Sequence, residues 1–179
     1  MAALRTLFLK ELHQGMYGLT PECGMACAQA ADVCLELTDA PHPAGFAVLG
    51  EDSVRLDVIW NPPSEQAKRS WRDRIEATEQ GATAIALLVS KSYLGEEVLE
   101  RSYIGGGFDY WVGKTVDSAD LFRDKKRLEI SGLLEGDINE LRRRSEKKIA
   151  QTRRSDELGY QAYVIVVGFR VRTLKIVLR

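Results

Sequence analysis

The order of helical and strand patterns constrains the fold of this chain more than any other feature. Between residues 64 and 169 the patterns follow the order helix, strand, strand, strand, helix, strand, at 64–92, 97–104, 108–113, 126–134, 137–154 and 160–169. Helices and strands mixed in this way pack as layers around one sheet. We therefore predict an α/β (α+β) single domain over residues 1–179, with a mixed central sheet flanked by helices and an α-β-β-β-α-β core.

Residues 1–63 form a helical and β-hairpin preface to this core. Leucines and a phenylalanine recur at helical spacing over 4–12, and Thr20-Pro21 is typical of a helix start. Two strands are expected at 45–50 and 53–60, around a turn at Gly50. The core occupies 64–169, and 170–179 adds a terminal strand.

Composition limits the class of protein. The 179 residues are 45% hydrophobic and 28% charged, as in ordinary globular domains. The longest apolar run, 162–167, is far shorter than a membrane span. Three cysteines (Cys23, Cys27 and Cys34) form no disulfide framework and are expected to pack in the core. We expect a cytoplasmic protein without membrane contact.

The charge is unevenly distributed along the chain. The net charge is −1, yet residues 123–154 carry 11 basic and 6 acidic side chains. A protein that binds nucleic acid gathers positive charge in this way. A solvated helix with paired charges explains the same segment equally well.

Three acidic residues occupy positions where solvated charges are unusual. Glu79 falls on the apolar stripe predicted for the helix 64–92, Asp109 interrupts the strand FDYWV, and Glu129 lies within the strand LEISGLL. A buried carboxylate is costly unless it is paired, hydrogen-bonded or bound to a metal. Their placement on neighbouring elements indicates a shared divalent cation, because Mg²⁺ prefers oxygen ligands.

These residues resemble the PD-(D/E)xK, restriction-endonuclease-like nuclease superfamily over residues 64–169. The segments GGGFDYW and LEIS, and the elements around them, carry the likeness, which extends to small bacterial proteins with GxGFDYWxG and LExSG segments. The resemblance implies Mg²⁺ (or Mn²⁺) held by Glu79, Asp109 and Glu129, with DNA as substrate. It also implies a bacterial DNA-processing or defence setting.

Ser131 departs from the superfamily pattern, which has a lysine at that position. Within the helix 137–154, Lys148 lies nearest the apolar face and is our candidate for a relocated lysine, although an ordinary surface lysine is the alternative. We expect Asp109, Glu129, Ser131 and Lys148 to be catalytic. Substrate contacts are expected from four residues: Arg144, Gln151, Gly106 and Gly107.

Each assignment has a structural alternative. Asp109 can accept hydrogen bonds from the glycine run, Glu129 can pair with Arg127 or Arg143, and Glu79 can be solvated. The glycines 105–107 fit either a close approach to DNA or a tight connection between strands.

Two functions from different classes remain open. The first is metal-dependent hydrolysis of DNA phosphodiester bonds. The second is a catalytically degenerate nuclease fold that docks on nucleic acid or on a protein partner, either another subunit or a second copy of the chain. The absence of a lysine at Ser131 and the acidic residues 1–122 favour the second.

Overall fold

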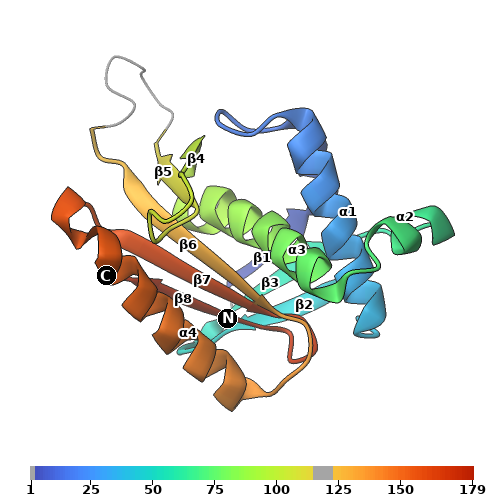
Figure 1. Cartoon of the computed structure of the whole chain (residues 1–179). Coiled ribbons are helices and arrows are strands. Elements are labelled where there is room, and N and C mark those ends of the chain that lie inside the picture. Colours follow the sequence, from blue (N-terminus) through green and yellow to red (C-terminus); the bar gives the residue numbers. More distant parts are fainter. Residues whose placement is uncertain (1–2, 115–122) are drawn as a thin grey trace.

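One mixed β-sheet runs through the protein (Figure 1). The computed structural model describes residues 3–114 and 123–179, and within them eight strands lie in the order β1-β3-β2-β8-β7-β6-β5-β4. The strands are β1 (Ala3–Phe8), β2 (Ala44–Val48), β3 (Glu51–Ile59), β4 (Glu97–Arg101), β5 (Tyr110–Gly113), β6 (Lys126–Leu133), β7 (Ala162–Gly168) and β8 (Thr173–Leu178). The predicted fold class, a single α+β domain with a mixed sheet, is confirmed.

Side-chain caps fix where the helices begin. The helices are α1 (Pro21–Leu37), α2 (Glu65–Ser70), α3 (Arg74–Val89) and α4 (Ile138–Thr152), with shorter turns η1 (Leu9–Gln14), η2 (Ser90–Leu94) and η4 (Arg153–Leu158). Thr20 caps α1 as its sequence predicts, by accepting a hydrogen bond from the Cys23 backbone. Asp137 and Glu140 form a reciprocal capping box at α4.

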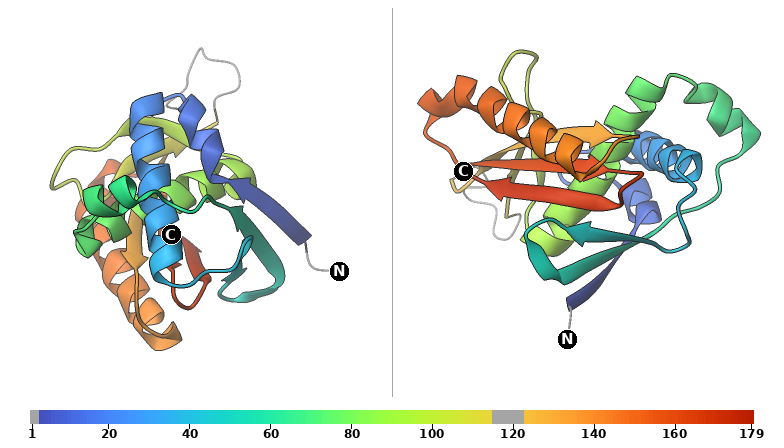
Figure 2. Two further views of the ribbon diagram at one scale, coloured as in Figure 1. Left: turned by 90° about the vertical axis from the view of Figure 1, so that its right-hand side faces the viewer. Right: turned by 90° about the horizontal axis from the view of Figure 1, so that it is seen from below.

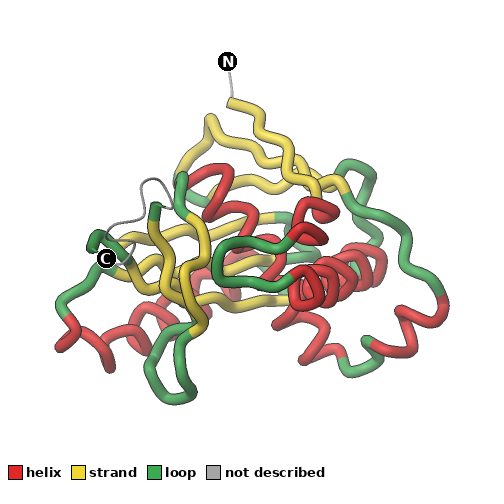
Figure 3. The backbone as a smooth tube through the Cα atoms, turned by 90° about the horizontal axis from the view of Figure 1, so that it is seen from above, coloured by secondary structure: helices red, strands yellow, loops and turns green. Residues whose placement is uncertain are grey.

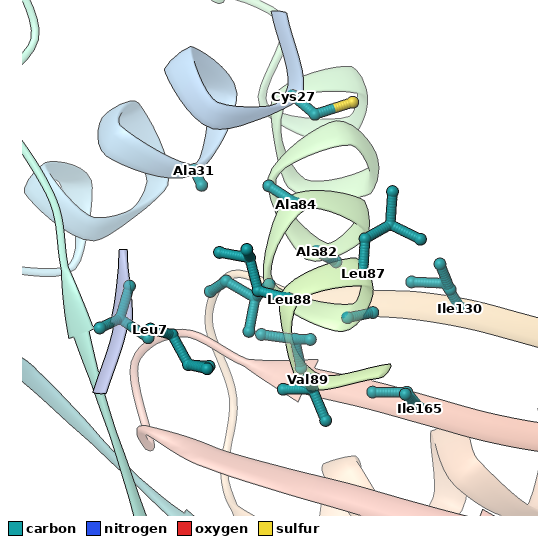
Figure 4. Packing of buried hydrophobic residues seen from close by; sticks show 14 of the residues in the cluster. Leu7, Cys27, Ala31, Ala82, Ala84, Leu87, Leu88, Val89, Ile130 and Ile165 are labelled. Atoms are coloured by element: carbon teal, nitrogen blue, oxygen red, sulfur yellow. The ribbon is translucent and has the colours of Figure 1, made fainter. Parts of the chain in front are cut away.

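The helices cover both faces of the sheet. In Figure 1 the strands β6, β7 and β8 lie between α3 on one side and α4 on the other. Strand β7 alternates accordingly: Ile165 and Val167 join the core under α1 and α3, whereas Val164 and Val166 pack with Leu141 of α4. Figure 4 shows side chains from α1, α3, β6 and β7 meeting in the larger core.

The first 63 residues differ from the prediction in one element. Residues 3–8 form the strand β1, which pairs in parallel with β3, where a helix over 4–12 was expected. Only residues 9–14 are helical, as the turn η1. The expected hairpin is present as β2 and β3. The preface is therefore part of the main sheet, and β1 lies at its margin near the chain start (Figure 3).

The long helix predicted over 64–92 is wrong in one respect, because it is broken. Asp73 accepts hydrogen bonds from the backbone of Ile75 and Glu76 and starts α3 anew after α2. Figure 2 shows α2 displaced to the periphery beside the end of α1. The rest of the predicted apolar stripe within α3 is buried, at Ala82, Ile85, Ala86 and Val89, but Ile75 in the first turn is 75% exposed.

The end of strand pairing along β6 creates the space for a site. Strand β7 pairs with residues Arg127 to Leu133 of β6. On the other edge of β6, β5 pairs only with residues Lys126 to Leu128. Beyond Leu128 the other edge of β6 has no strand beside it among the described residues. No helix in the described part of the chain is long and apolar enough to cross a membrane.

Candidate functional site at the free edge of strand β6

A cavity of about 480 Å³ lies at the free edge of β6, between α3 and α4. Five of the residues predicted from the sequence line it: Glu79, Asp109, Ser131, Arg144 and Lys148. They come from α3, the connection before β5, β6 and α4, so the fold brings together positions that are far apart in the chain. We call this cavity the β6 cleft.

Glu129 and Ser131 face α4 because a strand alternates its side chains. Leu128 and Ile130 enter the core under α3, which turns their neighbours to the opposite face. Glu129 is only 1% exposed, and Ser131 is also buried. The Arg144 guanidinium donates to Ser131 Oγ across 3.3 Å. Ser131 therefore contributes a hydroxyl and no charge, and the charge at this position comes from α4.

Lys148 reaches Glu129 from α4. Its ammonium nitrogen lies 2.6 Å from Glu129 Oε1 and 3.2 Å from Gln151 Oε1. Gln151 Nε2 donates to the same Glu129 oxygen across 3.1 Å. The second carboxylate oxygen, Oε2, is buried and has no hydrogen-bond partner among the described residues. The pairing with Arg127 or Arg143 considered from the sequence is not formed, since Arg127 instead contacts η4 and the backbone of Tyr160.

Asp109 marks the point where β5 leaves β6. Its backbone nitrogen donates to Leu128 O, and its side-chain Oδ2 accepts from the Ile130 backbone across 2.7 Å. The Asp109 carboxylate thus takes the place of the next backbone hydrogen bond between β5 and β6. The alternative, in which Asp109 accepts hydrogen bonds from the glycines 105–107, is not formed. This is the one hydrogen bond that the Asp109 side chain makes to the described residues, so its other oxygen remains free to bind a ligand.

Burial raises the pKa values of both carboxyls, and the charge of Asp109 raises that of Glu129 further. Burial is the main cause that raises the pKa of Glu129 to about 7; the charge of Asp109 adds to this, and Lys148 and Gln151 oppose it. Burial also raises the pKa of Asp109, against the Ile130 N–H and the positive charges of Lys148 and Arg101. A cation placed near these two carboxyls would stabilise their ionised forms.

Glu79 lies on the wall of the cleft and is exposed, not in the apolar stripe where it was predicted. Its charge raises the pKa of Asp109, which places the two within electrostatic range. The described residues contain no group of three acidic, histidine or cysteine side chains arranged to hold a metal. Asp109 and Glu129 would be the residues to hold a divalent ion, because the charge of Asp109 acts on Glu129 and Mg²⁺ is often bound by one or two carboxylates with water and phosphate.

The two glycines predicted to bind substrate are outside the cleft. Gly106 and Gly107 are buried in the β4–β5 connection. A Cβ at Gly107 would lie 3.0 Å from Gln151 O and 3.3 Å from Arg154 Cβ, so this glycine permits the loop to approach the end of α4. The glycines therefore fit the second expectation from the sequence, a tight connection between two strands, here β4 and β5. The cysteine prediction holds for Cys27 and Cys34, which are buried, but is wrong for Cys23, which is exposed.

Sequence reasoning missed two arginines of the cleft. Arg74 lies one turn before Thr78 at the start of α3, and Arg101 ends β4. With Arg144 and Lys148 they provide positive charge around the carboxylates. The helical spacing of Arg74, Thr78 and Glu79 is visible in the sequence, but its meaning depends on where α3 begins.

Comparisons with known proteins add no relative to these observations. No family model, no curated protein and no solved structure matches the chain. The resemblance to the PD-(D/E)xK superfamily therefore stays a prediction from the motifs.

Proposed function

We propose that the β6 cleft hydrolyses phosphodiester bonds of DNA with the help of Mg²⁺ or Mn²⁺. The observation that carries this proposal is the pairing of Glu129 with Lys148 next to Asp109, at a free strand edge between two helices. Paired carboxylates and an adjacent lysine in a cleft are what metal-assisted hydrolysis requires.

Asp109 and Glu129 would hold the ion in this proposal. Glu129 offers the buried oxygen without a partner, and Asp109 offers the oxygen that the strand does not use. When bound, the ion supplies positive charge that polarises the phosphate and acidifies a water. Glu79 is exposed on the same wall, at a position from which it orients water rather than completing a three-carboxylate group.

Lys148 would supply the positive charge that the superfamily lysine provides and that Ser131 lacks. Ser131 has no charge, but Lys148 brings an ammonium group from α4 to within 2.6 Å of Glu129. Lys148 lines the cleft, so it also faces the position of the phosphate. There it stabilises the negative charge that develops on the phosphate during hydrolysis. Arg144 and Arg101 bind the neighbouring phosphates of the strand.

The test is cleavage of plasmid and short duplex or single-stranded DNA by the purified protein with Mg²⁺ or Mn²⁺. We expect Asp109→Asn, Glu129→Gln and Lys148→Met each to lower the cleavage rate by about 100-fold or more, the effect of removing one preorganised charge from a reacting centre. A wild-type protein that cuts no DNA with either metal would refute the proposal.

Two residues provide matched controls. Glu96 is a second buried glutamate, 4% exposed and paired with Lys126, and its Oε2 also has no hydrogen-bond partner in the described chain. Its partner Lys126 does not line the β6 cleft, and Glu96 is not among the main groups that shift the pKa of Asp109 or Glu129, so Glu96→Gln should leave cleavage unchanged. Lys147 is the exposed neighbour of Lys148, and Lys147→Met should also cut at the wild-type rate. Equal losses in these controls would point to a general effect on folding.

A second candidate function is a binding module without catalysis. The specific observation in its favour is that Lys148 and Gln151 satisfy Glu129 Oε1 directly, so the pair is stable without a metal. In that case DNA or a protein partner docks at the cleft and the phosphodiester bond stays intact. DNA binding that is unaffected by Glu129→Gln, together with no cleavage, would favour this alternative.

A further inference from the structure

A second cavity of about 260 Å³ lies where α2 meets α3, beside the end of α1. Its apolar lining comes from Val33, Leu37 and Trp71. Its charged residues are Glu36, Lys68, Arg72 and Arg74. We call it the Trp71 pocket. The break between α2 and α3 forms it, because a continuous helix would not turn Trp71 toward α1.

The Trp71 pocket and the β6 cleft share a wall. Arg74 lines both cavities, and the next residue, Ile75, lines the cleft with 75% of its surface exposed. A chain that leaves the cleft along the start of α3 therefore passes Arg74 and reaches Trp71. Figure 2 shows this segment at the periphery, away from the strands.

The pocket places one aromatic ring beside two exposed arginines. The Trp71 indole is held by a 3.0 Å hydrogen bond from Nε1 to Gln29 Oε1, which fixes the ring. Arg72 and Arg74 are exposed, and neither has a carboxylate of a described residue within ion-pair distance, although the charge of Arg74 helps to lower the pKa of Glu135. Lys68, by contrast, is neutralised by Glu36 and Glu65. Aromatic rings beside unpaired arginines bind single-stranded nucleic acid by stacking on bases and pairing with phosphates.

We propose that the Trp71 pocket holds an unpaired nucleobase of the DNA strand that occupies the β6 cleft. Arg72 and Arg74 bind the phosphates between the two cavities. The substrate class is then DNA with a single-stranded segment next to the cleaved bond. The inference deepens the proposed function and rests on it for the position of that bond, whereas base binding itself does not require cleavage.

The test measures binding without cleavage. Fluorescence anisotropy compares the affinity of the protein for a blunt duplex and for the same duplex with a single-stranded tail, in buffer with the divalent metals chelated. We expect tighter binding of the tailed duplex, and Trp71→Ala should weaken that binding about tenfold while leaving the blunt duplex unchanged. A tenfold change corresponds to about 1.4 kcal/mol.

Further variants separate stacking from loss of folding. Trp71→Phe keeps an aromatic ring and should retain most of the preference for the tail. Arg72→Glu reverses an exposed charge in the pocket, so this variant should lose the preference for the tailed duplex while it still folds. Tyr17→Ala removes an exposed aromatic (59% exposed) that lines neither cavity and should bind like wild type.

The outcomes distinguish this inference from the proposed function. A wild-type protein that binds blunt and tailed duplexes equally, or binds neither, overturns the inference even if it cuts DNA. So does a preference for the tail that survives both Trp71→Ala and Arg72→Glu. A preference that these variants abolish, in a protein that never cuts DNA, supports the pocket and refutes only the hydrolysis.

Discussion

Replacing Glu129 with glutamine is expected to flatten the dependence of folding stability on pH. Glutamine has nearly the same shape, and its carbonyl oxygen can still accept the hydrogen bonds that Lys148 and Gln151 donate to Oε1. What it removes is a carboxyl group that is almost fully buried. The change therefore isolates the cost of ionising Glu129 inside the fold.

The pKa of Glu129 sets the magnitude and the sign. Burial and the charge of Asp109 raise it from the ordinary 4.5 to about 7. Below pH 4.5 the group is protonated in both folded and unfolded chains and does not affect the pH dependence. Between pH 4.5 and 7 the unfolded chain ionises first, so the folded state loses stability as pH rises. At 1.36 kcal/mol for each pKa unit, the loss amounts to about 3 kcal/mol above pH 7.

Urea denaturation at several pH values between 5 and 8 measures this effect in wild type and Glu129→Gln. Other titrating groups, such as Asp32, contribute to both proteins and cancel in the difference. We expect the variant to gain about 2.5 kcal/mol relative to wild type between pH 5 and pH 8, because a small part of the total is already present at pH 5. Equal pH slopes in the two proteins would refute the burial of an ionisable Glu129.

Two further predictions concern packing and thiol reactivity. Gly132→Ala would place a methyl group 2.6 Å from both Cγ2 and the carbonyl oxygen of Thr78, so α3 must move away from β6; we expect a loss of about 1–3 kcal/mol in unfolding free energy by urea titration, and wild-type stability would contradict the close packing. Burial raises the pKa of Cys27 to about 11 and of Cys34 to about 12, whereas Cys23 is exposed. A colorimetric thiol assay at pH 8 should therefore count one fast thiol in the native protein and three in denaturant, and three fast thiols without denaturant would contradict the burial.

Local signals in the sequence predicted the starts of α1, α2 and α4 and most strand positions. Thr20 followed by Pro21 begins α1 because a side-chain oxygen and a proline suit the first turn of any helix. The first strand could not be predicted in this way. Over residues 3–8 the apolar spacing fits a helix or a strand, and the choice depends on parallel pairing with β3, about 50 residues away.

The break before α3 shows how one missed cap changes a site prediction. Asp73 is a good N-cap, and reading it as one would have started a new helix at Arg74. The continuous helix instead treated Ile75 and Glu79 as interior positions, although they lie in the exposed first turns of α3, and it concealed both Arg74 and the Trp71 pocket.

The two residues of the Glu129–Lys148 pair could be identified from the sequence, although their contact could not. Glu129 interrupts an apolar strand, and Lys148 lies beside the apolar face of the following helix, so both positions are marked by local periodicity. The contact between them depends on how α4 packs across β6 and β7, which no local pattern specifies. The position of Asp109 at the end of strand pairing is likewise a property of the whole sheet.

We propose that Asp109 and Glu129 together bind one divalent ion, and a titration with Mn²⁺ measures this binding. Electron paramagnetic resonance counts the free Mn²⁺ at pH 8, where Glu129, with a pKa of about 7, is mostly ionised. We predict one bound ion for each chain in wild type and in Glu96→Gln, and none in Asp109→Asn or Glu129→Gln. No bound Mn²⁺ in wild type, or equal binding in all four proteins, would contradict the account.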